Sequence, residues 1–305
     1  ASVVAGNDEG VGHVDGYRQA ALLKAPTSIA ELPNGSFIFC ERLNSSLRVA
    51  SGPRGPTLYV PTQTLVGRFG RGFADGELRR AQLLQPAGLC VCIDGSVVIA
   101  DTGNRCLRRL HGDAAPVNLV PRESMRLTHV ALFAGNPKAG GDAAAFSGGS
   151  AREGAYPENE LDAPVSVVQL PAGEILVADA GSHTIKVAVV EKVKKPWTDG
   201  WSTAASKPMC RLMTLVGRGG KPGCVDGKGK VPGMPGEALV NTPASLHVAR
   251  SGRVLFVQGA GADREAAVRE LHLVPCVNRN CAHEACAAAR AAKTPLKASV
   301  KTVVG

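Results

Sequence analysis

The sequence predicts an all-β fold built from four stacked copies of one four-stranded unit. The first observation behind this prediction is a frame of positions that recurs 60 residues further along the chain. The frame is Pro26, Gly35, Glu41, Asn44 and Leu47, which return as Pro86, Gly95, Asp101, Asn104 and Leu107. The second is a supply of turn residues, 36 Gly and 20 Pro, which suits many short strands. Because one such unit cannot bury its apolar face alone, its copies are expected to stack.

Two further copies follow the same frame, with insertions that lengthen the period. The third contains Pro164, Gly173, Asp179 and Ile185, and the fourth contains Pro243, Gly252 and Gln258. We therefore expect residues 1–305 to form a single repeat domain, or a section of a longer one. The expected repeats cover approximately residues 7–67, 68–135, 136–217 and 218–305.

Each copy contains four short apolar runs bounded by Gly, Pro, Asn or Asp, which is typical of β-strands. Asn-Gly and Asp-Gly between the first two runs indicate hairpin turns, because Gly tolerates a positive φ. Four antiparallel strands in a repeated unit are typical of a β-propeller blade. The expected strands are residues 28–32, 36–41, 46–50 and 64–67; 87–93, 96–101, 106–110 and 130–135; 165–170, 174–179, 184–190 and 213–217; 244–250, 253–258, 268–274 and 300–305.

One extra outer strand is expected at residues 2–6, where Ser-Val-Val-Ala-Gly resembles the last strand of a copy. A last-strand sequence of the repeat then occurs at both the beginning and the end of the chain. Either the chain is part of a longer propeller, or its terminal strand pairs across the closure of the ring. An open ring would expose sheet edges that attract other chains. This favours a longer ring or self-association with a second copy that completes it.

The second copy carries the fullest motif. It contains Gly67-Arg-Phe-Gly-Arg-Gly, then Asp75-Gly76, then Ala81-Gln-Leu-Leu-Gln-Pro86, and finally Ala100-Asp101-Thr-Gly-Asn104. This order resembles the NHL-repeat family of β-propellers, and the resemblance covers nearly the whole chain. It implies four-stranded blades, usually more than four to a ring, and single-stranded RNA binding in some members. The fourth copy departs from the pattern, because Gln258 replaces the Asp and Gly259-Ala-Gly-Ala replaces the following turn.

Three inserted loops interrupt the period, at residues 139–155, 191–208 and 275–297. Insertions of this kind in repeat proteins map to loops that often lie on a binding face. The second insertion contains Trp197 and Trp201, which are expected to anchor that loop or to contact a protein.

The formal net charge of +9 is compatible with a polyanionic partner, although it also serves solubility alone. In an antiparallel blade the Gly-rich segments and the Asp-x-x-Asn turns emerge on the same face. Arginines interleaved with Phe on that face suit a protein contact or single-stranded RNA. A nucleotide-binding loop is disfavoured, because the Gly-rich segment leads into a strand rather than a helix. The binding residues expected there are Arg68, Phe69, Arg71, Phe73, Arg79, Arg80, Arg105, Arg218 and Lys221.

The recurring carboxylates are ambiguous between a metal-binding ring and a structural role. Asp and Asn at tight turns accept backbone N–H bonds and hold the turn in place, which favours the structural role. The residues assigned to it are Asp75, Asp101, Asn104, Asp179 and Asp226.

The nine cysteines include one dense group near the C-terminus. Cys276, Cys281, His283 and Cys286 are weak candidates for a zinc site, because their spacing matches no standard finger. A disulfide and free thiols are the alternatives for this group. The odd number of cysteines and their sparse pairing prospects favour a reducing, intracellular compartment.

The expected function is a non-enzymatic recognition scaffold that binds proteins through the propeller rim and the inserted loops. The alternatives are single-stranded RNA binding by the Arg-rich face and a metal-dependent lyase or hydrolase in the central channel. The channel alternative is disfavoured because the histidines do not recur at one repeat position, and only His247 falls on an inner strand. No cofactor is expected. No membrane span is expected either, since the sequence lacks a run of about 18 apolar residues.

Overall fold

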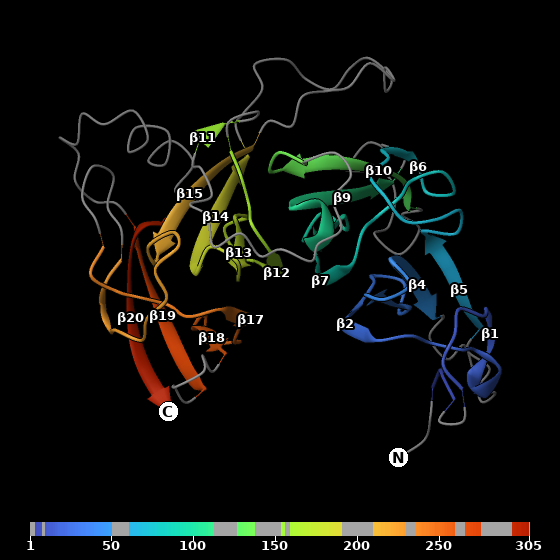
Figure 1. Ribbon diagram of the computed structural model, residues 1–305, viewed down its shortest axis with the longest axis horizontal. Helices are drawn as coiled ribbons and strands as arrows, with labels where there is room; N and C mark the ends of the chain where they lie inside the picture. Colours follow the sequence, from blue (N-terminus) through green and yellow to red (C-terminus); the bar gives the residue numbers. More distant parts are fainter. Residues whose placement is uncertain are drawn as a thin grey trace. The chain divides into compact units, whose positions relative to one another are not determined.

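The structure is a computed structural model that describes residues 4–7, 10–50, 61–112, 127–137, 154–155, 159–190, 210–229, 236–259, 266–275 and 295–304. Within these residues the chain is an all-β protein whose strands form four antiparallel sheets (Figure 1). The helical elements described are two single 3-10 turns, η1 (Arg18–Ala20) and η2 (Thr102–Asn104). None of the described helices is long and apolar enough to cross a membrane. The predicted fold class, a β-propeller with four blades in this chain, is confirmed.

Each sheet is one blade and falls within one of the expected repeats. From the inner strand outward, the first blade is β2 (Pro26–Glu31), β3 (Phe37–Glu41), β4 (Ser46–Ala50), β5 (Pro61–Val66) and β1 (Gly16–Tyr17). The second is β7 (Pro86–Val91), β8 (Val97–Asp101), β9 (Cys106–Gly112), β10 (Leu127–Ala134) and β6 (Gly76–Glu77). The third is β12 (Pro164–Gln169), β13 (Ile175–Asp179), β14 (Thr184–Val190), β15 (Cys210–Val216) and β11 (Gly154–Ala155). The fourth is β17 (Pro243–Val248), β18 (Val254–Gln258), β19 (Ala267–Pro275), β20 (Pro295–Val304) and β16 (Gly227–Lys228).

The fifth, outermost strand of each blade goes beyond the four strands that the sequence predicts. It is only two residues long, and in three blades it begins at the Gly of an Asp-Gly pair: Gly16, Gly76 and Gly227. It pairs antiparallel with the fourth strand of the blade, as in Gly76 of β6 opposite Val130 of β10. Of the extra strand expected at residues 2–6, residues 4–6 are described and lie outside the strands.

The local design repeats from blade to blade. Every inner strand begins at a proline and has a register shift directly after it, because proline lacks the N–H that the ladder needs. The hairpin that follows turns at a glycine with positive φ, as the sequence predicts. The four residues are Gly35, Gly95, Gly173 and Gly252, with φ of 78°, 83°, 102° and 80°.

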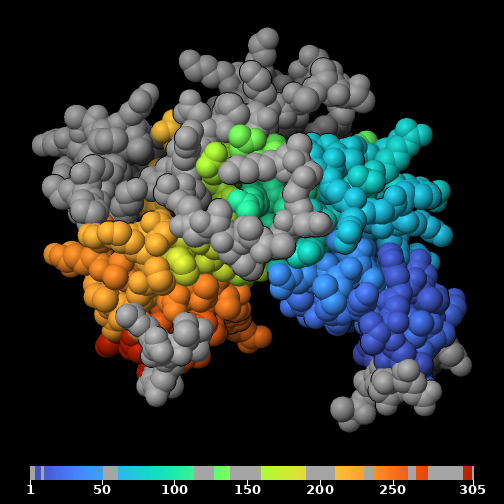
Figure 2. All heavy atoms as spheres, in the orientation of Figure 1, coloured from blue at the N-terminus to red at the C-terminus, as the bar shows by residue number. Residues whose placement is uncertain are grey.

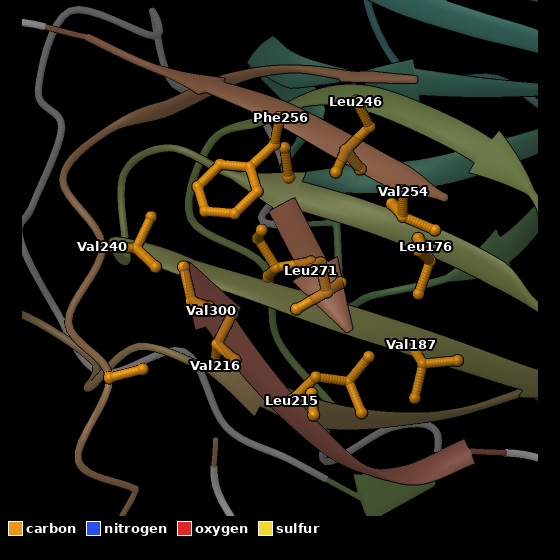
Figure 3. Close-up of a cluster of buried hydrophobic side chains, with 14 of the residues drawn as sticks. Leu176, Val187, Leu215, Val216, Val240, Leu246, Val254, Phe256, Leu271 and Val300 are labelled. Carbon is orange, nitrogen blue, oxygen red and sulfur yellow. The ribbon is translucent and has the colours of Figure 1, made fainter. Parts of the chain in front are cut away.

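The blades form two compact units of two blades each, residues 1–132 with 137–143 and residues 133–136 with 144–305. Ile38, Leu47, Leu89 and Ile99 contribute to the apolar core between the first two blades, which form one continuous blue-to-cyan surface in Figure 2. A second core joins the third and fourth blades. Figure 3 shows how its side chains, drawn from both sheets, face one another.

One polar contact occurs at the same place in both units. Ser28 Oγ of β2 accepts the Leu89 N–H of β7 at 3.2 Å, and Ser166 Oγ of β12 accepts the Leu246 N–H of β17 at 3.1 Å. Neighbouring inner strands are therefore joined within each unit by an equivalent bond. That all four blades belong to a single domain stays a prediction.

Candidate functional site

A buried cation occupies the same position in the third main strand of every blade. Arg48, Arg108 and Arg269 have no exposed surface, and Lys186, their counterpart in blade 3, is 1% exposed. Charged side chains are almost never buried this deeply unless they are paired. Their partners explain what the recurring carboxylates do.

Blade 2 shows the full arrangement. The Arg108 guanidinium donates to Asp101 Oδ2 at 3.2 Å, to Asp75, and to the backbone oxygens of Gln82 and Ala74 at 3.1 and 2.8 Å. It also lies over the Phe73 ring, 4.4 Å from the ring centre. Arg108 therefore joins the end of β8 to the Asp-Gly segment that forms β6. Phe73, expected on the binding face, packs on this internal cation.

Asp101 is fully buried and accepts hydrogen bonds on both oxygens. Oδ1 accepts the Leu84 N–H at 2.8 Å, and Oδ2 accepts from Asn104 Nδ2 at 2.7 Å as well as from Arg108. Burial raises the pKa of Asp101 to about 6, although Arg108 opposes that shift. Asn104 Nδ2 also donates to Gly72 O at 2.8 Å. This turn and the Gly-rich segment are thereby joined, on the same face of unit 1 as the sequence predicts.

The other blades vary this arrangement. In blade 1, Arg48 binds Glu41 and Asp15 at 3.2 and 3.0 Å. The equivalent Arg269 in blade 4 binds Asp226 and Gln258 at 2.8 and 3.0 Å. In blade 3, Lys186 donates to Asp179, and Ser182 Oγ donates to the same carboxylate at 2.6 Å. These five residues, Asp75, Asp101, Asn104, Asp179 and Asp226, thus bind groups within their own blades, and their structural role stays a prediction.

Sequence reasoning missed the buried cations, although a signal for them exists. In the first three blades the cation lies seven residues after the carboxylate, as in Glu41 and Arg48, Asp101 and Arg108, or Asp179 and Lys186. An exposed strand would show the same alternation of Leu and Arg. The recurrence of the pair in register with the repeat is what distinguishes the two cases.

Metal binding has no support among the side chains that the structure places. In the described part of the chain, no group of three or more His, Cys, Asp or Glu is arranged to hold a metal ion. Cys276, Cys281, His283 and Cys286 all lie outside the described residues, so the zinc hypothesis stays a prediction. The inserted loops likewise lie almost wholly outside them.

The expected binding residues divide between the two units. Arg68, Phe69, Arg71, Arg79 and Arg80 are exposed in unit 1, where Phe69 retains 70% of its accessible surface. Partly exposed Arg105 follows η2 in a left-handed conformation, with a φ of 55°. In unit 2, Arg218 and Lys221 are exposed and form a tight turn, in which the Lys221 N–H donates to Arg218 O at 2.9 Å.

One further aromatic residue is exposed in unit 1. Tyr17 lies in the outer strand β1 and is 57% exposed, yet sequence reasoning did not single it out. Its neighbour in the sequence, Gly16, is the Gly of an Asp-Gly pair equivalent to Asp75-Gly76. A search of the residues directly after each Asp-Gly pair would have found Tyr17.

Comparisons with known proteins assign neither a family nor an activity. No protein-family model matches the chain. A segment of 97 residues is 29% identical to Protein SUPPRESSOR OF QUENCHING 1, chloroplastic, of Arabidopsis thaliana, covering 32% of this chain and 9% of that protein.

Similar solved structures share low sequence identity with the chain. An auxiliary nutrient binding protein from Bacteroides ovatus is 16% identical with a TM-score of 0.48, covering 83% of this chain and 52% of that one. Virginiamycin B lyase from Staphylococcus aureus is 9% identical with a TM-score of 0.39, covering 81% and 52%. These neighbours are β-propeller proteins, and the chain spans about half the length of each.

Proposed function

We propose that this chain is an NHL-type β-propeller that acts as a recognition scaffold and binds a protein partner. The observation that carries the proposal is the segment Arg68–Phe69–Gly70–Arg71, in which a largely exposed aromatic ring lies between two exposed arginines. Aromatic residues, Phe among them, and Arg are enriched in protein interfaces, and Arg is also enriched among the few residues that dominate binding energy. The inserted loops at 139–155, 191–208 and 275–297, which lie almost wholly outside the described residues, are proposed as further contact segments.

The charge distribution favours a partner with an acidic surface. The buried cations of unit 1 are neutralised within their blades, as Arg108 is by Asp101 and Asp75. The exposed arginines of residues 68–80, which include Arg79 and Arg80, outnumber the exposed carboxylates of the same stretch, Asp75 and Glu77. An acidic partner surface would be steered toward them at low ionic strength.

Single-stranded RNA is the second candidate, and the same segment favours it. Bases stack on exposed aromatic rings while arginines contact the phosphates. Phe69 is 70% exposed and available for stacking, whereas Phe73 is 38% exposed and already packs against Arg108. This segment then offers one largely exposed stacking ring and one partly engaged one, which is why protein is the first choice.

A photo-crosslinking amino acid in place of Phe69 tests the proposal directly. We expect ultraviolet irradiation in extract from the source cells to give a covalent protein adduct that survives RNase. The matched control carries the same amino acid at Ile93, a 52% exposed apolar residue in a hairpin of the same unit. Adducts of equal yield at both positions, or none at Phe69, would contradict the proposal.

Salt dependence separates protein from RNA. If RNA is the ligand, adducts are lost with RNase, and affinity for a fluorescent single-stranded RNA falls steeply with salt because phosphate contacts release counterions. Changing Arg68 and Arg71 to Glu should then weaken RNA binding, while changing the exposed Arg250 of unit 2 should not. That the chain is not an enzyme stays a prediction.

A further inference from the structure

Every blade has two faces, a preceding face toward the blade before it and a following face toward the blade after it. Ile38 on the following face of blade 1 and Leu89 on the preceding face of blade 2 belong to the core of unit 1. Leu176 of blade 3 and Leu246 of blade 4 are their counterparts in the core of unit 2 (Figure 3). Among the described residues of each unit, no blade covers the preceding face of blade 1 or the following face of blade 4.

The preceding face of blade 1 exposes an apolar residue at a position that other blades bury. Ile29 of β2 holds the position that Leu89 holds in β7 and Leu246 in β17. Ile29 is 66% exposed, whereas Leu89 and Leu246 are each 6% exposed and lie in the cores between blades. Pro26, at the start of the same strand, is exposed, whereas the equivalent prolines of blades 2 and 4 are buried. The repeat therefore builds this face for contact with another blade.

The following face of blade 4 is open at the matching positions. Val257 of β18 corresponds to Cys40 of β3 and Ala178 of β13. Val257 is 39% exposed, whereas both counterparts are fully buried. Leu255 is partly exposed as well, although its counterpart Leu176 is buried. Blade 4 thus leaves uncovered the apolar positions with which blades 1 and 3 receive the next blade.

The hydrogen bond between neighbouring inner strands has counterparts on these two open faces. In unit 1, Ser28 Oγ accepts the Leu89 N–H at 3.2 Å, and unit 2 repeats this bond. Ser245 of β17 holds the position of Ser28 and is exposed. Ile29 in turn holds the position of Leu89. Blade 4 therefore presents the acceptor for another bond of this kind, and blade 1 presents the donor.

The open faces differ from the internal interface in one pair of positions, and the difference concerns charge. Val91 of blade 2 and Ala30 of blade 1 pack against the apolar core of unit 1. On the open face of blade 1, exposed Glu31 replaces Val91. On the open face of blade 4, exposed His247 replaces Ala30. Packing of these two faces in the manner of blades 1 and 2 would bring Glu31 close to His247.

The surroundings of His247 on blade 4 carry a net positive charge. The row of paired residues that begins at His247 continues through Glu270 to Lys301. Arg253 lies one row away and binds both carboxylate oxygens of Glu270, at 2.7 and 2.6 Å. Two cations therefore share one carboxylate, which leaves a positive charge to attract Glu31.

We propose that this chain assembles head to tail with a second copy of itself, so that blade 4 of one copy packs on blade 1 of the other. Ile29 then covers Val257, and Ser245 Oγ accepts the Ile29 N–H. Each copy offers one face of each kind, so the contact is heterologous and two copies satisfy all the open faces if the assembly closes. The Phe69 segment belongs to neither face. The inference therefore goes beyond the proposed function and does not depend on it.

Sedimentation equilibrium of the intact chain tests the proposal, over concentrations from about 0.1 to 100 μM. We expect the mass to rise from the 31.5 kDa of one copy to at least twice that value. Ile29→Arg should weaken association by about tenfold or more, because the contact would bury an unpaired charge. The matched control is Ile93→Arg, which changes a 52% exposed residue of the same unit and should leave association unchanged.

A charge exchange tests which faces meet. Glu31→Lys and His247→Glu should each weaken association, whereas a chain that carries both changes should regain it, because the two substituted side chains attract each other across the contact. A general loss of folding would not be rescued in this way. A wild type that stays at 31.5 kDa over the whole range would overturn the proposal. Equal weakening by Ile29→Arg and Ile93→Arg would overturn it too, as would a double variant that associates no better than either single one.

Discussion

The fourth blade differs from the first in one buried polar side chain. Gln258 holds the position that Glu41 holds in blade 1, and each contacts a fully buried arginine. Gln258 Oε1 accepts from Arg269, but its Nε2 has no hydrogen-bond partner among the described residues. Turning the amide over gives no relief, because Nε2 would then face the guanidinium. We therefore expect Gln258→Glu to stabilise blade 4.

The expected change in the free energy of unfolding for Gln258→Glu follows from opposing contributions. Relieving a buried unsatisfied N–H group is worth about 1–3 kcal/mol, and a hydrogen bond to a charged group about 1.5–3 kcal/mol. Burying another carboxylate costs several kcal/mol. In blade 1 Glu41 accepts from the Lys24 N–H, Ser46 Oγ and Arg48, which shows the site built around a carboxylate. Blade 4 has Ala267 in place of Ser46, so we expect a smaller net gain of about 1–2 kcal/mol.

Hydrogen exchange followed by mass spectrometry measures the change in stability of each blade separately. Gln258→Glu should slow exchange of the β18 and β19 amides by roughly 5- to 30-fold, the equivalent of 1–2 kcal/mol. The reciprocal change, Glu41→Gln, should speed exchange in β3 and β4, because Arg48 then loses its buried anionic partner. Each variant serves as the other's control, since unaffected blades should exchange as in the wild type.

The reasoning would be refuted by faster exchange in β18 and β19 of Gln258→Glu. That result would mean that burying the carboxylate costs more than its bonds to Arg269 return. It would also mean that Gln258 is the better solution for blade 4. Unchanged exchange in Glu41→Gln would show that a carboxylate at this position contributes nothing to the stability of blade 1.

Two further predictions concern blade 2. Burial, followed by the charge of Arg109, lowers the pKa of His111 to about 4; below the unfolded value of about 6.5, the unfolded state binds more protons. The contribution of His111 to stability should therefore fall by about 1 kcal/mol between pH 7 and pH 5, allowing for partial exposure. Asp101, whose pKa is raised to about 6, acts in the opposite direction over this range, so urea titrations should reveal the His111 contribution as the difference between the wild type and His111→Gln at the two pH values. Arg108→Met should cost about 3–5 kcal/mol of stability because buried Asp101 is left without its cation. Asp75→Asn should cost about 1 kcal/mol or less, since the Asp75 side chain is 45% exposed. Equal losses of stability for the two variants in thermal denaturation would contradict this reasoning.

The main strands could be predicted from the sequence because each signal is local. Apolar runs between Gly and Pro determine where strands lie, and Gly35 and its equivalents determine the hairpins. The outer strands could not be found in this way. Two residues are too few to show a period, and Gly76-Glu77 becomes a strand only because β10 lies alongside it.

The candidate site was predictable in its exposed part and not in its buried part. Arg68, Phe69 and Arg71 were expected on the surface, and they are exposed. Arg108 is an arginine in an apolar run that could equally be exposed, yet it is buried. Its burial depends on ion pairs with Asp101 and Asp75, which come from other parts of the chain. Burial of a charge is a property of tertiary pairing, which a single strand does not reveal.

The buried network holds the base of the exposed loop that we propose binds a partner. The base of the Gly-rich segment is held at Gly72, whose N–H donates to Leu83 O and whose oxygen accepts from Asn104, and at Ala74 and Asp75 by Arg108. At its other end, a Cβ on Gly67 would lie 2.5 Å from Ser45 O, so the chain passes closely over blade 1.

Only the short tip that carries Phe69 then remains outside these contacts. A recognition loop fixed at both ends loses less conformational entropy on binding than a free one. Phe69→Ala should for this reason weaken binding while leaving the urea midpoint unchanged, since Phe69 is 70% exposed and the segment is held at its two ends, by the pairing of Val66 with Leu47 and by the hydrogen bonds of Gly72. Loss of stability in that variant would show instead that the ring packs against the blade and is not presented to a partner.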